Sequence, residues 1–149
     1  MSDLGTWYAT LITAHAVGDH IVQSDRDACE KALPGRTGQL ACVRHVVSYT
    51  ATAALALAAT AAVTGTRART GRVLAGLAVS AISHYVIDRR VLLKRFAEAT
   101  GKARFFQLGA PRPGHDDNPT LGTGAYALDQ SAHHFFLFAA ALIIAGGAR

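Results

Sequence analysis

The sequence predicts an all-α protein, a bundle of four transmembrane helices in a single helical membrane domain that covers residues 1–149. Two observations lead to this prediction. Four apolar segments contain no lysine or arginine, and most are close to the ~20 residues that a helix needs to span a bilayer. Charged residues make up only 17% of the chain, yet its net charge is +5. Soluble domains average about 25% charged residues, so the charges of this chain must lie mainly between the apolar segments.

The first two apolar segments cover residues 5–23 and 46–64. No basic region precedes the first segment and no small-residue cleavage pattern follows it, so we expect a permanent helix rather than a removed signal peptide. The second segment is rich in alanine, and its polar residues are chiefly threonine, which a membrane helix accommodates easily. It lacks the polar face of a soluble helix. Because alanine also favours helices in water, a soluble metal-binding helical bundle is the alternative.

The third and fourth apolar segments cover residues 73–88 and 125–146. Between them, residues 89–106 mix lysine and arginine with leucine and phenylalanine. This composition predicts a basic amphipathic segment that continues the third helix and then lies on the anionic inner leaflet of the membrane. The expected partner of the basic residues is therefore the lipid bilayer rather than a nucleic acid.

The distribution of positive charge predicts the orientation of the chain. Four spans place both termini on one side of the membrane and the loops 24–45 and 89–124 on the other. These two loops hold all lysine and arginine residues except Arg67, Arg69, Arg72 and Arg149. Because basic loops stay in the cytoplasm, we expect a multi-pass protein of the cell (inner) membrane with cytoplasmic long loops and both termini outside.

Three histidine–aspartate pairs interrupt the apolar segments, and the members of each pair are one helical turn apart. The first and third segments have histidine before aspartate, whereas the fourth segment, which runs in the opposite direction, has aspartate before histidine. All three aspartates are thus expected at the cytoplasmic side of their histidines, and a further histidine begins the second segment. The sequence therefore predicts a metal centre near the cytoplasmic leaflet with the ligands His15, Asp19, His45, His84, Asp88, Asp129 and His133.

Imidazole and carboxylate ligands together suit a divalent transition metal such as zinc, manganese or iron, and helical bundles hold one or two such ions in this way. We expect a mononuclear or dinuclear site. Ionisable groups in a membrane helix are costly and usually functional. Two other readings are open: the pairs join the helices by hydrogen bonds and ion pairs, or they form a proton or ion relay.

A metal in this position would activate water, so the leading interpretation is a metal-dependent hydrolase acting on a phosphate-containing amphiphile. Asp19 or Asp88 would be the general base, and Gln23 would orient the water or the substrate. The substrate's anionic group would bind Arg44, Arg89 and Arg90, which border the predicted site.

The rival interpretation is a non-enzymatic membrane protein, either an ion or proton transporter subunit or a phage or host interaction protein. The oligomeric state stays open, because the small residues of the second segment allow close helix packing within or between chains. His20 and His134 adjoin predicted ligands, but neighbours on a helix point about 100° apart, so neither is predicted to be a ligand.

Four motifs resemble a known family: HisAlaValGlyAspHisIleValGln at positions 15–23, ArgHis at 44–45, SerHisTyrValIleAspArgArg at 83–90 and AspGlnSerAlaHis at 129–133. In this order they resemble the domain-of-unknown-function family 3307 of small bacterial and phage membrane proteins. The resemblance implies a polytopic helical membrane protein and no established activity. It places the family's His, Asp and Gln pattern on the predicted ligands together with Gln23 and Gln130. A looser similarity is to membrane-bound metal-dependent hydrolases.

Overall fold

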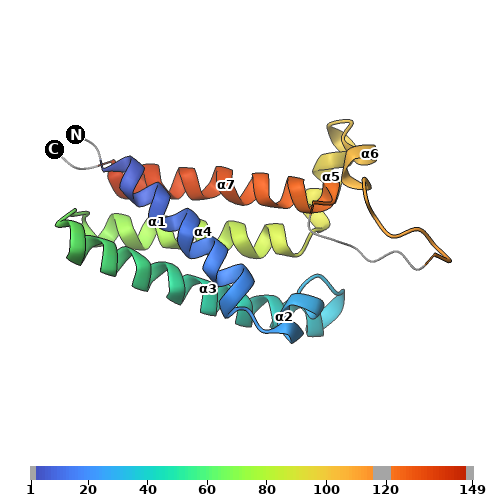
Figure 1. Cartoon of the computed structure of the whole chain (residues 1–149), viewed down its shortest axis with the longest axis horizontal. Coiled ribbons are helices and arrows are strands. Elements are labelled where there is room, and N and C mark those ends of the chain that lie inside the picture. Colours follow the sequence, from blue (N-terminus) through green and yellow to red (C-terminus); the bar gives the residue numbers. More distant parts are fainter. Residues whose placement is uncertain (1–2, 116–121, 147–149) are drawn as a thin grey trace.

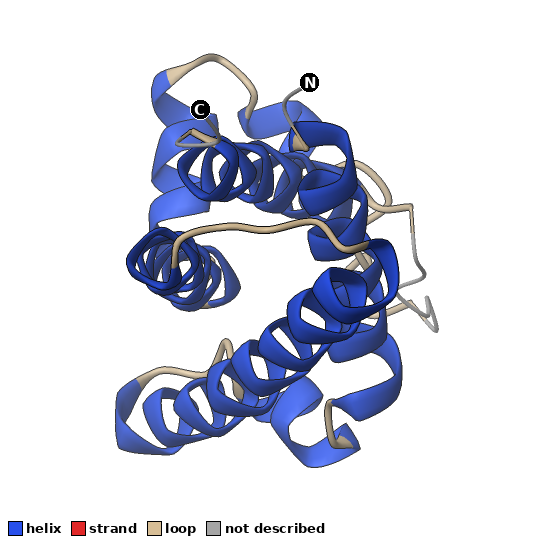
Figure 2. Cartoon of the chain, turned by 90° about the vertical axis from the view of Figure 1, so that its left-hand side faces the viewer, coloured by secondary structure: helices blue, strands red, loops and turns tan. Residues whose placement is uncertain are grey.

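The computed structural model describes residues 3–115 and 122–146, and every regular element in these ranges is a helix (Figures 1 and 2). The prediction of an all-α protein is thus confirmed for the described residues. The elements are α1 (Leu4–Val17), the π-helix η1 (Gly18–Val22), α2 (Asp25–Glu30), α3 (Gly35–Thr64), α4 (Thr70–Asp88), α5 (Val91–Ala99), α6 (Ala103–Phe106) and α7 (Gly124–Ala145).

Four of these helices pack together along the length of the molecule. Helices α3, α4 and α7 run side by side, and α1 crosses them obliquely (Figure 1). The contacts are α4 with α7, α1 with α3 and with α7, and α3 with α4. The apolar core lies in the half of the bundle that carries the chain ends, around Trp7, Leu11, Leu57, Leu137 and Ile144. The other half of the bundle contains the histidine–aspartate pairs.

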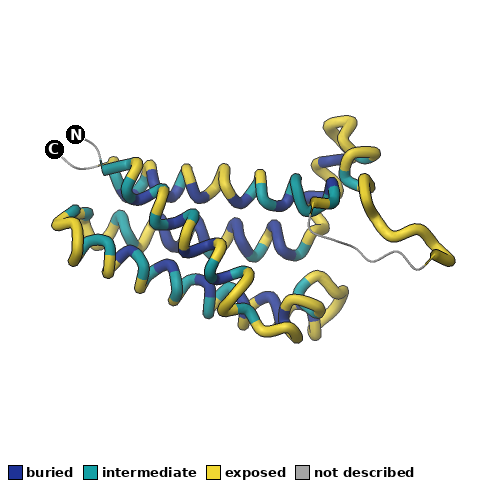
Figure 3. Tube along the Cα trace, viewed as in Figure 1, coloured by how far each residue is buried: buried dark blue, intermediate teal, exposed yellow. Residues whose placement is uncertain are grey.

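Three helices, α3, α4 and α7, are long and apolar enough to cross a membrane. Their outward faces are apolar, with Leu55, Val63, Leu74, Ile82 and Phe135 exposed, and Figure 3 shows how exposed positions line the outside of the bundle. These features indicate membrane association. The fourth predicted span differs, because the α-helical part of the first apolar segment has only 14 residues, fewer than the ~20 that a bilayer requires.

The first apolar segment leaves α-helical geometry at Gly18. From there to Val22 it is a π-helix, in which the amide of Gln23 donates to the carbonyl of Gly18 (3.0 Å). The extended backbone of Gln23 (ψ 133°) then ends the helix. Such π-helical turns are often found at functional sites, and this one contains Asp19.

Helix α3 is 30 residues long and runs from Gly35 to Thr64. It therefore begins well before residue 46, where the second apolar segment starts. The prediction placed His45 at the start of this helix, and the structure places it well inside. The apolar periodicity could not reveal this extension, because the exposed positions of the added turns mix Arg36, Gln39 and Arg44 with Leu40 and Val43. Gly38 lies so close to the backbone of Leu33 and to Arg89 that a Cβ there would clash, which explains why the chain can turn tightly before α3.

The basic amphipathic segment is present as α5, in which Leu93 and Ala97 are buried while Lys94 and Arg95 are exposed. It does not continue the preceding helix as the sequence suggested. Helix α4 ends at Asp88, and Arg90 adopts a left-handed conformation (φ 57°) that turns the chain into α5.

Candidate metal centre

All seven predicted ligands lie in one buried cluster where α1 and η1 meet α3, α4 and α7. Every one of these side chains is at least nine-tenths buried. They come from four segments that are far apart in the sequence, and the alternation of helix direction brings them to the same level of the bundle. The side chains that meet are His15, Asp19, His45, His84, Asp88, Asp129 and His133.

Four ligand atoms form a compact first group. The Nε2 atoms of His45 and His84 are 2.8 Å apart. Oδ1 of Asp19 lies 3.4 Å from Nε2 of His45 and 3.3 Å from Nε2 of His84. Oδ2 of Asp88 lies 3.2 Å from each of the same two nitrogens. Two imidazoles and two carboxylates from three different elements, η1, α3 and α4, thus face one common point.

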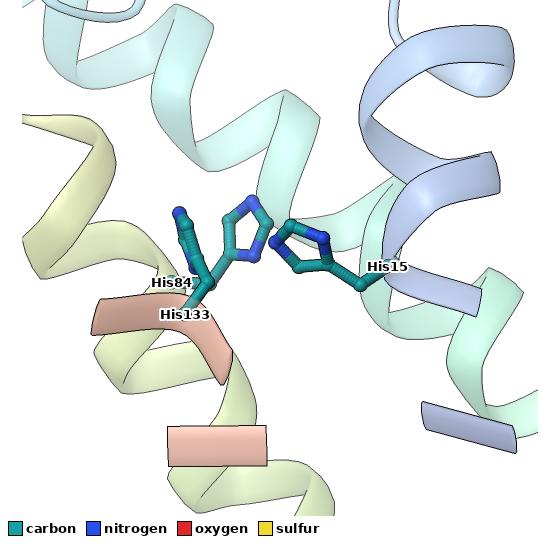
Figure 4. A group of neighbouring side chains, drawn as sticks. All are labelled: His15, His84 and His133. Carbon is teal, nitrogen blue, oxygen red and sulfur yellow. The ribbon is translucent and has the colours of Figure 1, made fainter. Parts of the chain in front are cut away.

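The remaining three residues lie beside this group. Nε2 of His133 is 3.4 Å from Oδ1 of Asp88 and 3.7 Å from Oδ2 of Asp129. Nε2 of His15 is 3.4 Å from Oδ2 of Asp19. The rings of His15, His84 and His133 face one another from α1, α4 and α7 (Figure 4), and their candidate ligand atoms lie within 4.8 Å of one another.

Several of these buried atoms have no hydrogen-bond partner among the described residues: Nε2 of His15, Nε2 of His133, Oδ1 of Asp19, Oδ2 of Asp88 and Nδ1 of His84. A buried polar atom without a partner costs about 1–3 kcal/mol, and native proteins contain few such atoms. Their concentration at one point gives a cluster of groups that could hold a metal ion.

The ring of His84 is held in place by Tyr49 of α3. The two rings are stacked, with their centroids 4.0 Å apart and an angle of 24° between their planes. The Tyr49 hydroxyl shares a 2.6 Å hydrogen bond with Ser80, one turn before His84. A Cβ at Gly18 would lie 3.0 Å from Cδ2 of Tyr49, so the glycine lets η1 approach α3 closely.

Gln23 contacts a ligand rather than occupying the centre of the cluster. Its amide is best oriented with the nitrogen donating to the backbone oxygen of Asp19 (3.1 Å) and the oxygen accepting from Nδ1 of His45 (3.3 Å) and from Nζ of Lys31 (3.2 Å). A hydrogen bond to the outer nitrogen of a metal-binding histidine fixes the ring and directs Nε2 inward. The position of Gln23 suits this orienting role.

Lys31, which follows α2, is the residue of the cluster that sequence reasoning missed. Its Nζ lies 2.9 Å from Oδ2 of Asp88, within ion-pair distance although this oxygen has no aligned hydrogen bond. Nη1 of Arg89 donates to the Lys31 carbonyl (2.6 Å) and holds the loop in place. In the sequence Lys31 follows the first of the motifs that resemble the family and belongs to the same pattern, but this pattern does not assign it a role in the site.

The three arginines predicted to bind an anion have different surroundings. Arg44 donates two hydrogen bonds to Asp27 of α2, Arg89 holds the Lys31 loop, and Arg90 is exposed at the turn between α4 and α5. Burial on its own raises the pKa of the Asp27 carboxyl, but the hydrogen bonds from Arg44 outweigh this effect and hold the pKa below its ordinary value. Arg44 and Arg89 thus both fasten the segment that presents Lys31.

His20 and His134 are exposed and belong to none of the candidate ligand groups, although the His134 ring lies edge-on to that of His15 with the centroids 6.3 Å apart. Nδ1 of His20 contacts the carbonyl oxygen of Ala16, one turn earlier, at 3.0 Å. The two residues are therefore natural controls for experiments on the buried histidines.

Fold and site together define a class: a helical, membrane-associated protein with a buried histidine–aspartate cluster of metal-binding composition. The chain belongs to the family DUF3307, described as proteins of unknown function, whose model matches residues 8–147. All the residues of the cluster lie inside the matched range. Comparisons with curated proteins and with solved structures gave no match, so the looser similarity to membrane-bound metal-dependent hydrolases has no support from them.

Proposed function

We propose that this protein is an integral membrane hydrolase that binds a divalent transition metal, namely zinc, manganese or iron, and cleaves a phosphate-containing amphiphile at the cytoplasmic leaflet. The observation that carries the proposal is the first group of ligand atoms, formed by His45, His84, Asp19 and Asp88. Two neutral imidazoles and two carboxylates are a ligand set that these metals favour.

The distances favour metal ligands over direct hydrogen bonds. Charge-assisted hydrogen bonds between nitrogen and a carboxylate are about 2.7–2.9 Å long. In a tetrahedral site with bonds of about 2.0–2.1 Å, neighbouring ligand atoms are roughly 3.3 Å apart. The nitrogen–oxygen distances of the first group are 3.2–3.4 Å. These nitrogen–oxygen distances suit ligands of one ion better than a network of ion pairs that joins the helices. The two Nε2 atoms of His45 and His84, 2.8 Å apart, would have to separate slightly for both to bind the ion.

A bound metal of this kind would bring the pKa of a coordinated water close to neutrality. The chain supplies the remaining functions. Asp19 directs Oδ1 toward His45 and His84. Its other oxygen, Oδ2, lies beside His15 and is placed to accept a proton from the attacking water. The ammonium group of Lys31 faces the same point, 2.9 Å from Oδ2 of Asp88, and suits an anionic substrate group. Gln23 links Lys31 to His45 and keeps both in position.

The orientation proposed for the chain places this chemistry at the cytoplasmic surface. Lys31, Arg44, Arg89 and Arg90 all lie at the end of the bundle that contains the cluster. Positively charged residues of this kind stay on the cytoplasmic side. A negatively charged headgroup in the inner leaflet would therefore meet the cluster from the same side as these cations.

A groove between α1 and α3 supports an amphiphilic substrate. It has a volume of about 450 Å³ and is lined mostly by alanine and threonine, including Ala9, Thr13, Val17, Thr52 and Ala56. Ligand pockets commonly measure about 300–1,000 Å³. Val17 and His15 both lie in the last turn of α1, so the groove ends at the level of the cluster along the bundle.

Elemental analysis of the detergent-purified protein tests the proposal most directly. We expect stoichiometric zinc, manganese or iron in the wild-type protein and in His134→Ala, and a loss of metal in His84→Ala and Asp88→Ala.

Phosphate release from a long-chain phosphate ester should require the metal. Ala56→Trp, which fills the groove, should raise KM for a long-chain substrate but not for a short soluble one.

Three outcomes would replace the proposal. A wild-type protein without stoichiometric metal would leave the cluster as a structural network. Metal binding without hydrolysis, combined with ion flux in proteoliposomes that Asp19→Asn stops, would favour the transporter. Release of the chain from membranes by carbonate washing would favour a soluble metal-binding bundle.

A further inference from the structure

The cluster contains a second set of ligand atoms that the proposed metal site does not use. This set consists of Asp129, His133 and the second oxygen of Asp88, all of them buried. Nε2 of His133 lies 3.4 Å from Oδ1 of Asp88 and 3.7 Å from Oδ2 of Asp129. As in the first group, these distances are too long for strong charge-assisted hydrogen bonds and are close to the separation of ligands on one ion.

Asp88 connects the two sets. Its Oδ2 faces His45 and His84, each at 3.2 Å, while its Oδ1 faces His133 on the other side. A carboxylate whose two oxygens face two separate groups of histidines has the geometry of a bridge between two ions. Two-metal sites that share ligands in this way are common in enzymes that cleave phosphate esters.

His15 is the fourth ligand that the second set needs. Its ring centroid lies 4.6 Å from that of His133, and the Nε2 atoms of both rings are buried without a hydrogen-bond partner among the described residues. Two unpartnered imidazole nitrogens on the same side of the cluster are expensive to bury. A cation between them and the two carboxylates would satisfy both.

The formal charges of the cluster are compatible with a second ion when an anionic group is also bound. Three aspartates and Lys31 together carry a net charge of −2, because these histidines bind metal in the neutral form. One divalent ion would only neutralise this charge. Two divalent ions would make the site positive by two charges, which suits a phosphate group that carries negative charge.

We propose that the protein binds two divalent metal ions, the second through His15, His133 and Asp129, with Asp88 bridging the two sites. This inference rests on the proposed metal-dependent function and specifies its nuclearity. It assigns separate ligands to each ion: His45, His84 and Asp19 to the first, and His15, His133 and Asp129 to the second.

The test is the number of metal ions per chain in the detergent-solubilised full-length protein after reconstitution with Mn²⁺. We expect two in the wild-type protein and in the control His134→Ala, and one in His133→Ala and in Asp129→Asn. Electron paramagnetic resonance should show two spin-coupled manganese ions in the wild type and an uncoupled ion in both variants. Asp129→Asn preserves the shape of the side chain, so it keeps the test valid if His133→Ala fails to fold.

Each result has a distinct meaning. A single ion in the wild type, or two ions retained in Asp129→Asn with unchanged coupling, would overturn the second site. No stoichiometric ion in the wild type would overturn the proposed function itself. Two ions without spin coupling would refute the bridging role of Asp88.

Discussion

Lys31 shows how one residue can oppose metal binding and still serve the proposed reaction. Its ammonium group lies 2.9 Å from the same Asp88 oxygen that faces His45 and His84. A positive charge in this position would repel the proposed divalent ion and attract the proposed anionic substrate. The two effects have opposite signs and can be separated by measuring metal affinity and substrate affinity independently.

Replacing Lys31 by methionine should therefore tighten the binding of Zn²⁺ or Mn²⁺ roughly tenfold, corresponding to about 1.4 kcal/mol, because the repulsion is removed. Titration calorimetry in detergent measures this change. The same variant should raise KM for the phosphate amphiphile, and Lys31→Arg should resemble the wild type in both measurements. Loss of metal in Lys31→Met would show instead that the ammonium group organises Asp88 for binding.

At the scale of elements, the packing of α4 against α7 depends on Gly76. A Cβ at this position would lie 2.7 Å from Cγ1 of Ile144 and 3.0 Å from the carbonyl oxygen of Ala140. Gly71, on the same helix, has no atom of a neighbouring element within 4 Å of such a Cβ. Helix α4 thus contains one glycine in a tight contact, Gly76, and one with open space around it, Gly71, which serves as its control.

Gly76→Ala should destabilise the protein by about 1–3 kcal/mol, the range for overpacking a well-packed contact. Gly71→Ala should be neutral or slightly stabilising, because alanine favours the helix more than glycine does. Unfolding of the two variants in the same detergent gives the comparison. Equal stability of both variants would contradict the close approach of α4 and α7.

The attachment of α2 to α3 should depend on pH. Hydrogen bonds from Arg44 hold the pKa of Asp27 below its value in the unfolded chain, which is about 3.9. This contribution to stability is therefore complete above the unfolded pKa and is lost as the pH falls through the lower, folded pKa.

The measurement is the difference in unfolding temperature between the wild type and Asp27→Asn in detergent. We expect the wild type to be more stable at pH 6 and this advantage to shrink toward pH 3. Arg44→Gln should remove most of the advantage at both values, because it removes the group that shifts the pKa. An advantage that does not change with pH would refute the role assigned to this ion pair.

Sequence periodicity predicts the long helices well, but it does not predict where a helix begins, turns into a π-helix or ends. The start of α3 at Gly35 and the π-helix at Gly18 both depend on contacts with distant residues, with Arg89 in the first case and Tyr49 in the second. The turn at Arg90 has a left-handed backbone conformation without the glycine that usually adopts it, so the sequence contains no signal for this turn. These features arise from tertiary packing, which a local pattern does not contain.

At the scale of the whole molecule, the orientation in the membrane can be tested with the native cysteines. Cys29 is exposed in α2, on the side proposed to be cytoplasmic, whereas Cys42 is buried in α3. We expect a membrane-impermeant maleimide to label Cys29 in inverted membrane vesicles but not in intact cells.

The matched control is Thr66→Cys in the variant Cys29→Ser. Thr66 lies in the short connection between α3 and α4, at the opposite end of the bundle, so its thiol should be labelled from outside in intact cells. Labelling of Cys29 from outside would invert the proposed topology and move the cluster to the outer leaflet.

The convergence of the cluster is the part of the site that sequence predicts best. Three pairs with one-turn spacing, reversed in the fourth segment, meet at one level because antiparallel helices alternate in direction. Lys31 and the pairing of Arg44 with Asp27 lie beyond such reasoning. They depend on how the connection between η1 and α3 folds back on the bundle, which no periodic pattern encodes.

The division of the bundle into an apolar half and a polar half has a consequence for the order of assembly. The half around Trp7, Leu57 and Leu137 is held by side-chain packing and can form as soon as the helices meet. The other half brings three buried carboxylates together, and under the proposed function it would be complete only after cations bind them. If the proposed metal site is correct, insertion into the membrane and metal loading would be separate events, and a cell short of metal would accumulate a chain that is inserted but lacks its metal.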